Sequence, residues 1–219
     1  MARVARAVRA EGLSRVGRAL PAARATVVLA SASPRRRALL EAAGWPPRVL
    51  AVDADESLLP GETPEQACER LALIKARAGA ARLREDGEDG LVVAGDTLVV
   101  VEGEVLGKPA DAPAARAMLA RLAGRDHVVL SSAALVDVPS GRTRSGLARA
   151  VVRFAPLPPA TLETYLASGE WEGKAGAYAI QGAAARFATL VAGDLDTVIG
   201  LSVALVGRLH ASLAQARAS

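Results

Sequence analysis

The chain has 219 residues, 51% of them hydrophobic, which is enough for one domain or for two lobes that share a core. It holds a single cysteine, Cys68, and no apolar run near the roughly 18 residues of a membrane-spanning helix. An intramolecular disulfide framework and a cysteine-rich zinc site are therefore excluded. We expect a cytoplasmic protein without a membrane partner.

The net positive charge belongs to the first 24 residues. Residues 1–24 carry six arginines and one acidic residue, whereas 21 basic and 22 acidic residues make up the rest. We interpret 1–24 as an Arg/Ala-rich N-terminal extension and 25–219 as the domain. A transit peptide and a nucleic-acid-binding arm are alternatives for the extension, but we do not expect nucleic acid as a partner.

The first predicted strand, 25–30, leads into a turn rich in small residues and arginines. Ser33 suits an N-cap and Pro34 suits the first helical position, so a helix is predicted to start there. Backbone N–H groups at a helix N-terminus bind anions, whereas cations are unfavourable at this end. The arginines at 35–37 therefore indicate a phosphate site, with a solvated basic turn as the alternative.

A short strand at 48–52 precedes an acidic cluster at 53–56. These carboxylates predict either a Mg²⁺ contact or a solvated turn. A capping box then opens a helix predicted for 63–83. Lys75 lies next to the apolar stripe of this helix, where a snorkelling surface lysine is the ordinary interpretation.

The stretch 91–100 is the centre of the pattern. Valine and leucine without polar alternation indicate a strand buried on both faces, and a tight Gly-Asp-Thr step is predicted to divide it into two runs. An unpaired buried charge costs several kcal/mol. Asp96 is therefore expected either near solvent at a strand end or held in place for chemistry.

The rest of the chain continues as strands and helices, which predicts an α/β fold. We predict a strand at 104–106, a helix at 111–124, a hairpin of strands at 127–138 and 142–154, a helix at 159–167, a strand-like run at 177–182, a strand at 186–191 and a closing helix at 201–213. Most polar residues that interrupt this pattern fall at predicted strand ends, where open α/β sheets bind ligands.

Those polar residues form a candidate site. They are Ser31, Arg35, Arg36, Glu56, Lys75, Asp96, Thr97, Lys108, Lys174 and Gln181. Several cations, two carboxylates and one amide suit a polyphosphate with a base attached. Glu56 and Asp96 suit a metal ion, and Asp96 also suits proton abstraction from water that attacks phosphorus. The Gln181 amide can donate and accept, as the edge of a pyrimidine or purine requires.

Four segments, in this order, resemble the Maf, or septum-formation, nucleotide pyrophosphatases: Leu29–Arg36, Ala94–Thr97, Gly107–Pro109 and Lys174–Gly182. The resemblance covers about 25–213. It implies a Maf/inosine-triphosphatase-like α/β fold, with an elongated mixed β-sheet flanked by helices and two lobes about a central cleft. It also implies hydrolysis of a nucleoside triphosphate to the monophosphate and pyrophosphate with Mg²⁺ or Mn²⁺, and a homodimer.

The resemblance also assigns roles. The general base falls on Asp96 and the metal-side acid on Glu56. Phosphate and specificity contacts fall on Ser31, Arg35, Arg36, Lys75, Thr97, Lys108 and Gln181. The sequence at 178–182 is similar to the dTTP/UTP branch, which implies a role in cleaning the nucleotide pool. The alternatives are the 7-methyl-GTP branch and a non-catalytic nucleotide-binding regulator of cell division.

Three positions depart from the family pattern. Gly95 replaces an alanine and is expected to loosen the backbone before the base. Gly173 replaces an aspartate, which removes one charge beside Lys174. Ser131 and Ser132 replace a Thr-Gly pair. None of the three changes removes a catalytic group.

Overall fold

The computed structural model describes residues 25–215, so the extension expected at 1–24 lies outside the described residues. Within them, seven strands form one mixed sheet in the order β2-β1-β3-β5-β6-β7, with β4 paired to β3. The strands are β1 (Val27–Leu29), β2 (Arg48–Val49), β3 (Leu91–Val101), β4 (Glu104–Leu106), β5 (Asp126–Asp137), β6 (Thr143–Phe154) and β7 (Ala188–Ala192). Only the pairings of β1, with β2 and β3, are parallel in this sheet of residues 25–215.

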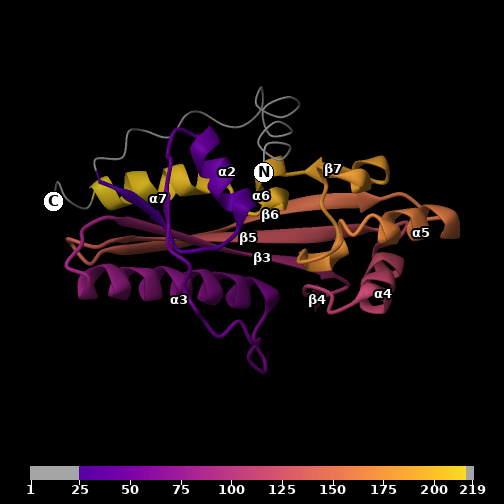
Figure 1. The fold of residues 1–219 in the computed structure, drawn as a ribbon, viewed down its shortest axis with the longest axis horizontal. Coiled ribbons are helices and arrows are strands. Elements are labelled where there is room, and N and C mark those ends of the chain that lie inside the picture. Colours follow the sequence, from indigo (N-terminus) through magenta and orange to yellow (C-terminus); the bar gives the residue numbers. More distant parts are fainter. Residues whose placement is uncertain (1–24, 216–219) are drawn as a thin grey trace.

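Helices cover both faces of the elongated sheet (Figure 1). The α-helices are α2 (Pro34–Ala42), α3 (Pro64–Glu85), α4 (Ala112–Leu122), α5 (Pro159–Ala167), α6 (Leu195–Ile199) and α7 (Val203–Gln215), and the 3₁₀ turns are η1 (Ala175–Ala177) and η2 (Ala183–Arg186). Helix α3 covers one face, while α2, α6 and α7 lie on the other. The predicted α/β fold with a helix-flanked mixed sheet is confirmed. No helix within 25–215 combines the length and apolar character that a membrane crossing demands.

The helices begin where the sequence predicts caps. Ser33 Oγ accepts a backbone N–H at the start of α2, and Asp111 Oδ1 does the same for α4. Thr63 and Gln66 form both halves of the capping box of α3. Each bond satisfies a backbone donor that the first helical turn leaves without an intrahelical partner. Local chemistry therefore sets these three boundaries.

Strand β3 is buried on both faces, as its apolar sequence predicts. Leu91 and Val93 contribute to the core beneath α2 and α7, whereas Val92 and Ala94 pack against α3. Helix α3 approaches closely because it presents small residues to the sheet: a Cβ added at Gly79 would lie 2.9 Å from the Ala30 Cβ. The backbone of β3 is thus held between two packed layers.

The predicted break in this strand is wrong. β3 runs without interruption from Leu91 to Val101, and residues 95–97 pair with Ala133, Ser132 and Ser131 of β5. The ladder with β5 extends along nearly the whole strand, so it holds a glycine and an aspartate in extended conformation despite their low strand propensity. Asp96 is consequently a buried mid-strand residue, 6% exposed.

Three other local predictions need correction. The run 177–182 is not a strand, because Gly176 and Ala177 adopt positive φ angles of 66° and 62°, which end any extended ladder. The strand predicted at 48–52 has only two paired residues. The closing helix begins at Val203, after the unpredicted short helix α6.

One edge of β3 is divided between two partners. β5 occupies one edge, while on the other β1 pairs with 91–93 and β4 pairs with 99–101. Among the described strands, none pairs with 94–98 on this second edge. The parallel strand β1 ends here and leads into α2. The fold therefore leaves an opening in the sheet beside Asp96, where the ends of several elements meet.

An aromatic cluster ties the segment after η1 to the sheet. His127 on β5 lies with its Nε2 2.8 Å from the Tyr178 hydroxyl, and Phe154 on β6 packs edge-on against both rings. His127 is 2% exposed. Burial lowers the pKa of His127 to about 4, with the charge of Asp126 opposing the shift. The buried imidazole is therefore neutral at physiological pH.

This histidine is expected to make stability fall below pH 6.5. The unfolded chain binds a proton at His127 below about pH 6.5, whereas the folded protein binds it only near pH 4, so the unfolded state holds more protons in between. Stability is complete above this window and declines as the pH falls, by roughly 2 kcal/mol at pH 5. Urea unfolding of wild type and His127→Gln at pH 7 and pH 5 tests this. His210 is present in both proteins, so parallel pH profiles would contradict the expectation.

Candidate active site

A cleft of about 530 Å³ lies at the open edge of β3, within the size range of small-molecule sites. Its walls come from the β1–α2 turn, α3, β3, the end of β4, the segment 173–181 and the turn 198–200. All ten residues of the predicted site line it: Ser31, Arg35, Arg36, Glu56, Lys75, Asp96, Thr97, Lys108, Lys174 and Gln181. Residues separated by up to 150 positions in the sequence therefore share one cavity.

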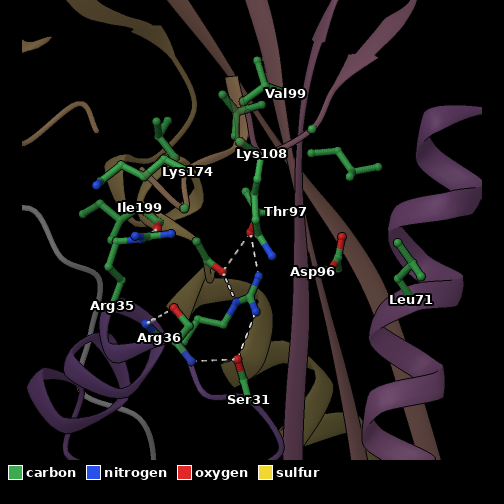
Figure 2. Close-up of a pocket in the computed structure, with 18 of the residues that line it drawn as sticks. Ser31, Arg35, Arg36, Leu71, Asp96, Thr97, Val99, Lys108, Lys174 and Ile199 are labelled. Carbon is green, nitrogen blue, oxygen red and sulfur yellow. Dashed lines mark hydrogen bonds between the residues drawn. The ribbon is translucent and has the colours of Figure 1, made fainter. Parts of the chain in front are cut away.

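The cleft reaches both faces of β3. Asp96 and Thr97 are neighbours in a strand, so their side chains point to opposite faces. Figure 2 shows Asp96 on the side of α3, and Thr97 with Arg36 on the other side. Because the strand edge is open here, one ligand can contact both groups around it. We call the residues around Asp96 the carboxylate–lysine group (Glu56, Lys75, Asp96 and Lys108) and the residues around Thr97 the arginine group (Ser31, Arg35, Arg36 and Thr97).

Lys75 is the centre of the carboxylate–lysine group. Its Nζ lies 2.6 Å from Asp96 Oδ1 and 2.6 Å from Glu56 Oε1, and Lys108 Nζ lies 3.6 Å from Glu56 Oε2. Lys75 is 7% exposed, so the snorkelling surface lysine is wrong. The hydrogen bond from Lys75 holds the pKa of Glu56 below its ordinary value, with further help from the charges of Lys75, Lys108 and Arg36.

The arginine group is a hydrogen-bond network that includes two backbone carbonyls, those of Ile199 and Gly200. Arg36 Nε donates to Gly200 O at 2.9 Å, Nη1 to Ser31 Oγ at 3.1 Å and Nη2 to Thr97 Oγ1 at 3.1 Å. Arg35 Nε donates to Ile199 O at 3.3 Å. Three of the five guanidinium N–H groups of Arg36 are thus used within the protein. The other two remain for a ligand, so Arg36 is both oriented and able to bind an anion.

Lys174 and Gln181 form the third wall, from the segment around η1. Lys174 Nζ donates to Glu172 O at 3.2 Å. Burial and the charge of Arg35 lower the pKa of Lys174, and the carboxylates of Glu170 and Glu172 oppose this shift. Glu170 also accepts the Ala183 N–H at 2.8 Å and so braces the turn that carries Gln181. Gln181 lines the cleft together with the apolar residue Ile180.

Two departures from the Maf pattern have structural explanations. Gly95 does not loosen the strand, because it sits in the ladder opposite Ala133. A Cβ there would lie 2.9 Å from Ser132 O and 3.0 Å from Leu201 Cδ1, so glycine allows the close approach. Gly173 has a φ of +65°, a conformation that favours glycine.

The turn formed by Ile199 and Gly200 was not predicted from the sequence. Its backbone carbonyls accept from both arginines, and no side chain at these positions indicates such a role. A usable signal was present: Asp194 suits an N-cap, and Gly200, six residues later, suits the end of a short helix. That pattern predicts the short helix α6 and the turn after it.

The two carboxylates of the site suit a hard divalent cation. Glu56 and Asp96 both contact the same ammonium group, so their oxygens converge on one cationic position. The described residues contain no group of three or more His, Cys, Asp or Glu side chains placed to hold a metal. Mg²⁺ is commonly bound by one or two carboxylates together with substrate phosphates and water. The donor set therefore fits a metal that arrives with a phosphate ligand.

Fold and site together define an α/β protein with a cleft lined by cationic and carboxylate side chains at an interrupted sheet edge. The family model of Maf-like proteins matches residues 26–213, so this chain belongs to the Maf family.

Curated relatives cover most of the chain. It is 48% identical over 186 residues to the dTTP/UTP pyrophosphatase of Moorella thermoacetica, which covers 84% of this chain and 93% of the relative. It is 46% identical over 182 residues to the dTTP/UTP pyrophosphatase of Burkholderia thailandensis, covering 80% and 87%. The enzyme of the same name from Novosphingobium aromaticivorans is 46% identical over 184 residues, covering 84% and 89%.

Two solved structures align with part of the chain. The nucleoside-triphosphatase, or dITP/XTP pyrophosphatase, of Mycobacterium abscessus is 26% identical with a TM-score of 0.38, over 61% of this chain and 76% of that one. The Ham1 protein of Staphylococcus aureus is 18% identical with a TM-score of 0.42, over 59% and 72%.

Proposed function

We propose that this protein is a nucleoside triphosphate pyrophosphatase that hydrolyses dTTP and UTP to the monophosphate and pyrophosphate, and so cleans the nucleotide pool. The observation that carries the proposal is the convergence of five cationic side chains and two carboxylates on one cleft. The names of relatives 46–48% identical over most of their length support the choice of substrate.

The cations are assigned to the triphosphate. Arg35 and Arg36 can give paired N–H donors to phosphate oxygens, which is the geometry that guanidinium groups match best. Lys75, Lys108 and Lys174 approach from the other walls of the cleft. The hydroxyls of Ser31 and Thr97 hold Arg36 and line the same space. Together these groups offset the negative charge that the substrate brings into a partly buried site.

Asp96 is assigned as the general base. In the proposed reaction the oxygen of a water molecule bonds to the α-phosphorus, and the bond from that phosphorus to the bridging oxygen breaks. The β- and γ-phosphates leave as pyrophosphate, and the water proton passes to the Asp96 carboxylate. Lys75 donates to Oδ1 of Asp96, which leaves Oδ2 to accept from water.

Glu56 and Asp96 are assigned to hold a divalent metal ion, Mg²⁺ or Mn²⁺. Both carboxylates line the cleft and contact Lys75, and hard cations prefer such oxygen donors. When bound, the ion would neutralise charge on the phosphates and so favour attack at phosphorus.

The wall from the η1 segment is assigned to the base and its recognition. Tyr178 and Ile180 give it apolar surface, Val99 of β3 also lines the cleft, and Gln181 supplies an amide that can donate and accept. Thr97 lines the cleft and contributes to specificity in this assignment. A pyrimidine ring presents a donor–acceptor edge that an amide can match.

The test is pyrophosphate release from dTTP, UTP, CTP, ITP and 7-methyl-GTP, with Mg²⁺ or Mn²⁺ and with chelator. We expect dTTP and UTP to give the highest kcat/KM and to yield the monophosphate. A clear preference for 7-methyl-GTP would assign the other branch. Tight nucleotide binding without hydrolysis would favour the non-catalytic regulator of cell division.

Three further assignments complete the proposal. We place the activity in the domain 25–219 and treat 1–24 as an extension of it, which deletion of 1–24 tests by leaving kcat/KM unchanged. The homodimer rests on the Maf resemblance and is tested by light scattering of the purified chain. The cytoplasmic location is tested by fractionation of cells that express the full chain.

A further inference from the structure

The corner between α6 and α7 is organised by one buried carboxylate that the reaction does not use. Asp196 is 6% exposed. Its Oδ1 accepts the Thr197 N–H at 2.7 Å, and its Oδ2 accepts the Val203 N–H at 2.7 Å, seven residues further on. Its backbone carbonyl accepts the N–H groups of Gly200 and Leu201 at 2.9 and 3.1 Å. One residue therefore fixes both ends of the turn that Gly200 occupies.

This turn presents its carbonyl groups to the arginine group. Gly200 O accepts from Arg36 Nε at 2.9 Å and from Thr97 Oγ1 at 3.1 Å. The preceding carbonyl, Ile199 O, accepts from Arg35 Nε. Figure 2 shows these bonds converging between Arg36, Thr97 and the turn. Gly200 has a φ of +140°, so the peptide orientation depends on a conformation that residues with a Cβ rarely adopt.

We infer that Asp196 is a positioning residue for the phosphate site. It fixes the Gly200 carbonyl, and that carbonyl orients the Arg36 guanidinium so that its remaining N–H groups point into the cleft. The inference rests on the proposed function in that Arg36 is assigned to the triphosphate. The inference goes beyond the proposed function because it places the turn 196–203 in the phosphate-binding machinery. This turn contains no side chain of the predicted site.

The alternative is that Asp196 only stabilises the start of α7. Different measurements distinguish the two roles. A residue that only stabilises the helix affects the free energy of unfolding, whereas a positioning residue also affects phosphate affinity in the folded protein. Inorganic tripolyphosphate is a suitable probe, since it can occupy the phosphate subsite without touching the base wall. Its affinity is measured by calorimetry at a temperature where every variant is folded by circular dichroism.

We expect Asp196→Ala to raise both the Kd of tripolyphosphate and the KM of UTP about tenfold, the effect of one well-oriented charged hydrogen bond. Asp196→Asn should raise both values less, because its amide oxygen can still accept one of the two N–H groups. The kcat for UTP should change less than KM. In an Arg36→Lys background, Asp196→Asn should add little, because the oriented guanidinium is already gone.

Two variants serve as controls. Asp111→Asn changes another aspartate that accepts a helix N-terminal N–H, at 2.8 Å from Ala114, but on α4 outside the cleft. Leu83→Ala opens a cavity at the far end of α3 and provides a comparable loss of stability. Both should keep the wild-type Kd for tripolyphosphate.

Three results would overturn the inference: unchanged Kd values in both folded Asp196 variants, a Kd in Leu83→Ala that rises as much as in Asp196→Asn, or full additivity of Asp196→Asn with Arg36→Lys. The proposed function fails separately. If the wild-type protein hydrolyses no nucleotide but binds tripolyphosphate, and Asp196→Asn weakens that binding, the reaction is wrong and the positioning role of Asp196 stands.

Discussion

Replacing Asp96 by asparagine is expected to lower kcat for UTP by about 10²–10⁴, the usual contribution of a positioned acid–base group. Asparagine keeps the size of the side chain and can still accept from Lys75, which lies 2.6 Å from Oδ1 in the wild type. What it loses is the ability to take a proton from water. Steady-state release of pyrophosphate measures the effect, and KM should change much less than kcat.

Substrate binding separates the loss of a base from a general loss of the site. Calorimetric titration with a non-hydrolysable UTP analogue should give a Kd for Asp96→Asn within about tenfold of wild type, because the arginine group lies on the other face of β3. Glu163→Gln is the matched control, since Glu163 is an exposed carboxylate paired with Arg116 outside the cleft. If Asp96→Asn turns over UTP at nearly the wild-type rate, Asp96 is not the base.

The position of Asp96 also shows how far sequence reasoning reaches. The residue type and its apolar surroundings were enough to single it out, because a carboxylate in a buried strand needs a partner. That partner, Lys75, lies 21 residues earlier on a helix, and helical spacing alone indicated a surface lysine. The pairing depends on how α3 packs across β3, which no local pattern encodes.

The caps of α2, α3 and α4 were predictable because they depend on local contacts and not on long-range packing. A cap is a bond between residues two or three positions apart, so the residues at 33, 63 and 111 carry their own signal. The continuity of β3 was not predictable in this way. Glycine and aspartate at 95 and 96 favour a break locally, but the ladder with β5 overrides them.

The features of the site that the sequence did not predict come from backbone groups. The open edge of β3 exists because β1 and β4 pair with different parts of the same edge, a consequence of the topology of the whole sheet. The Ile199 and Gly200 carbonyls act through main-chain atoms that every residue possesses. Unusual side chains in the sequence indicate the residues that line the cleft, but they give no sign of the backbone groups that orient those residues.

Replacing Lys75 by methionine is expected to destabilise the protein by about 3–5 kcal/mol, the range for removing one partner of a buried ion pair. Lys75 is the shared counter-ion of Asp96 and Glu56, at 2.6 Å from each. Methionine fills a similar volume but leaves two carboxylates facing each other, one of them 6% exposed. Urea unfolding in the presence of chelator measures the loss.

A divalent cation should restore part of that stability. In the wild type the ammonium of Lys75 competes for the oxygens proposed to hold the metal, whereas in Lys75→Met those oxygens have lost their cation. Saturating Mn²⁺ should therefore raise the Tm of Lys75→Met more than that of wild type, since a ligand stabilises in proportion to its affinity for the folded state. The double variant Lys75→Met with Asp96→Asn should be more stable than Lys75→Met and respond less to Mn²⁺.

An exposed ion pair on α3, the helix that carries Lys75, provides the control for the Lys75→Met prediction. Arg82 lies on α3, exposed, and pairs with Asp86 at 3.0 Å beyond the reach of the cleft. Arg82→Met should cost less than about 1 kcal/mol, as exposed ion pairs do, and its Tm should shift with Mn²⁺ as the wild type does. If Lys75→Met is no less stable than Arg82→Met, the buried ammonium does not neutralise the two carboxylates. If its Tm gains nothing extra from Mn²⁺, Glu56 and Asp96 do not form the metal site.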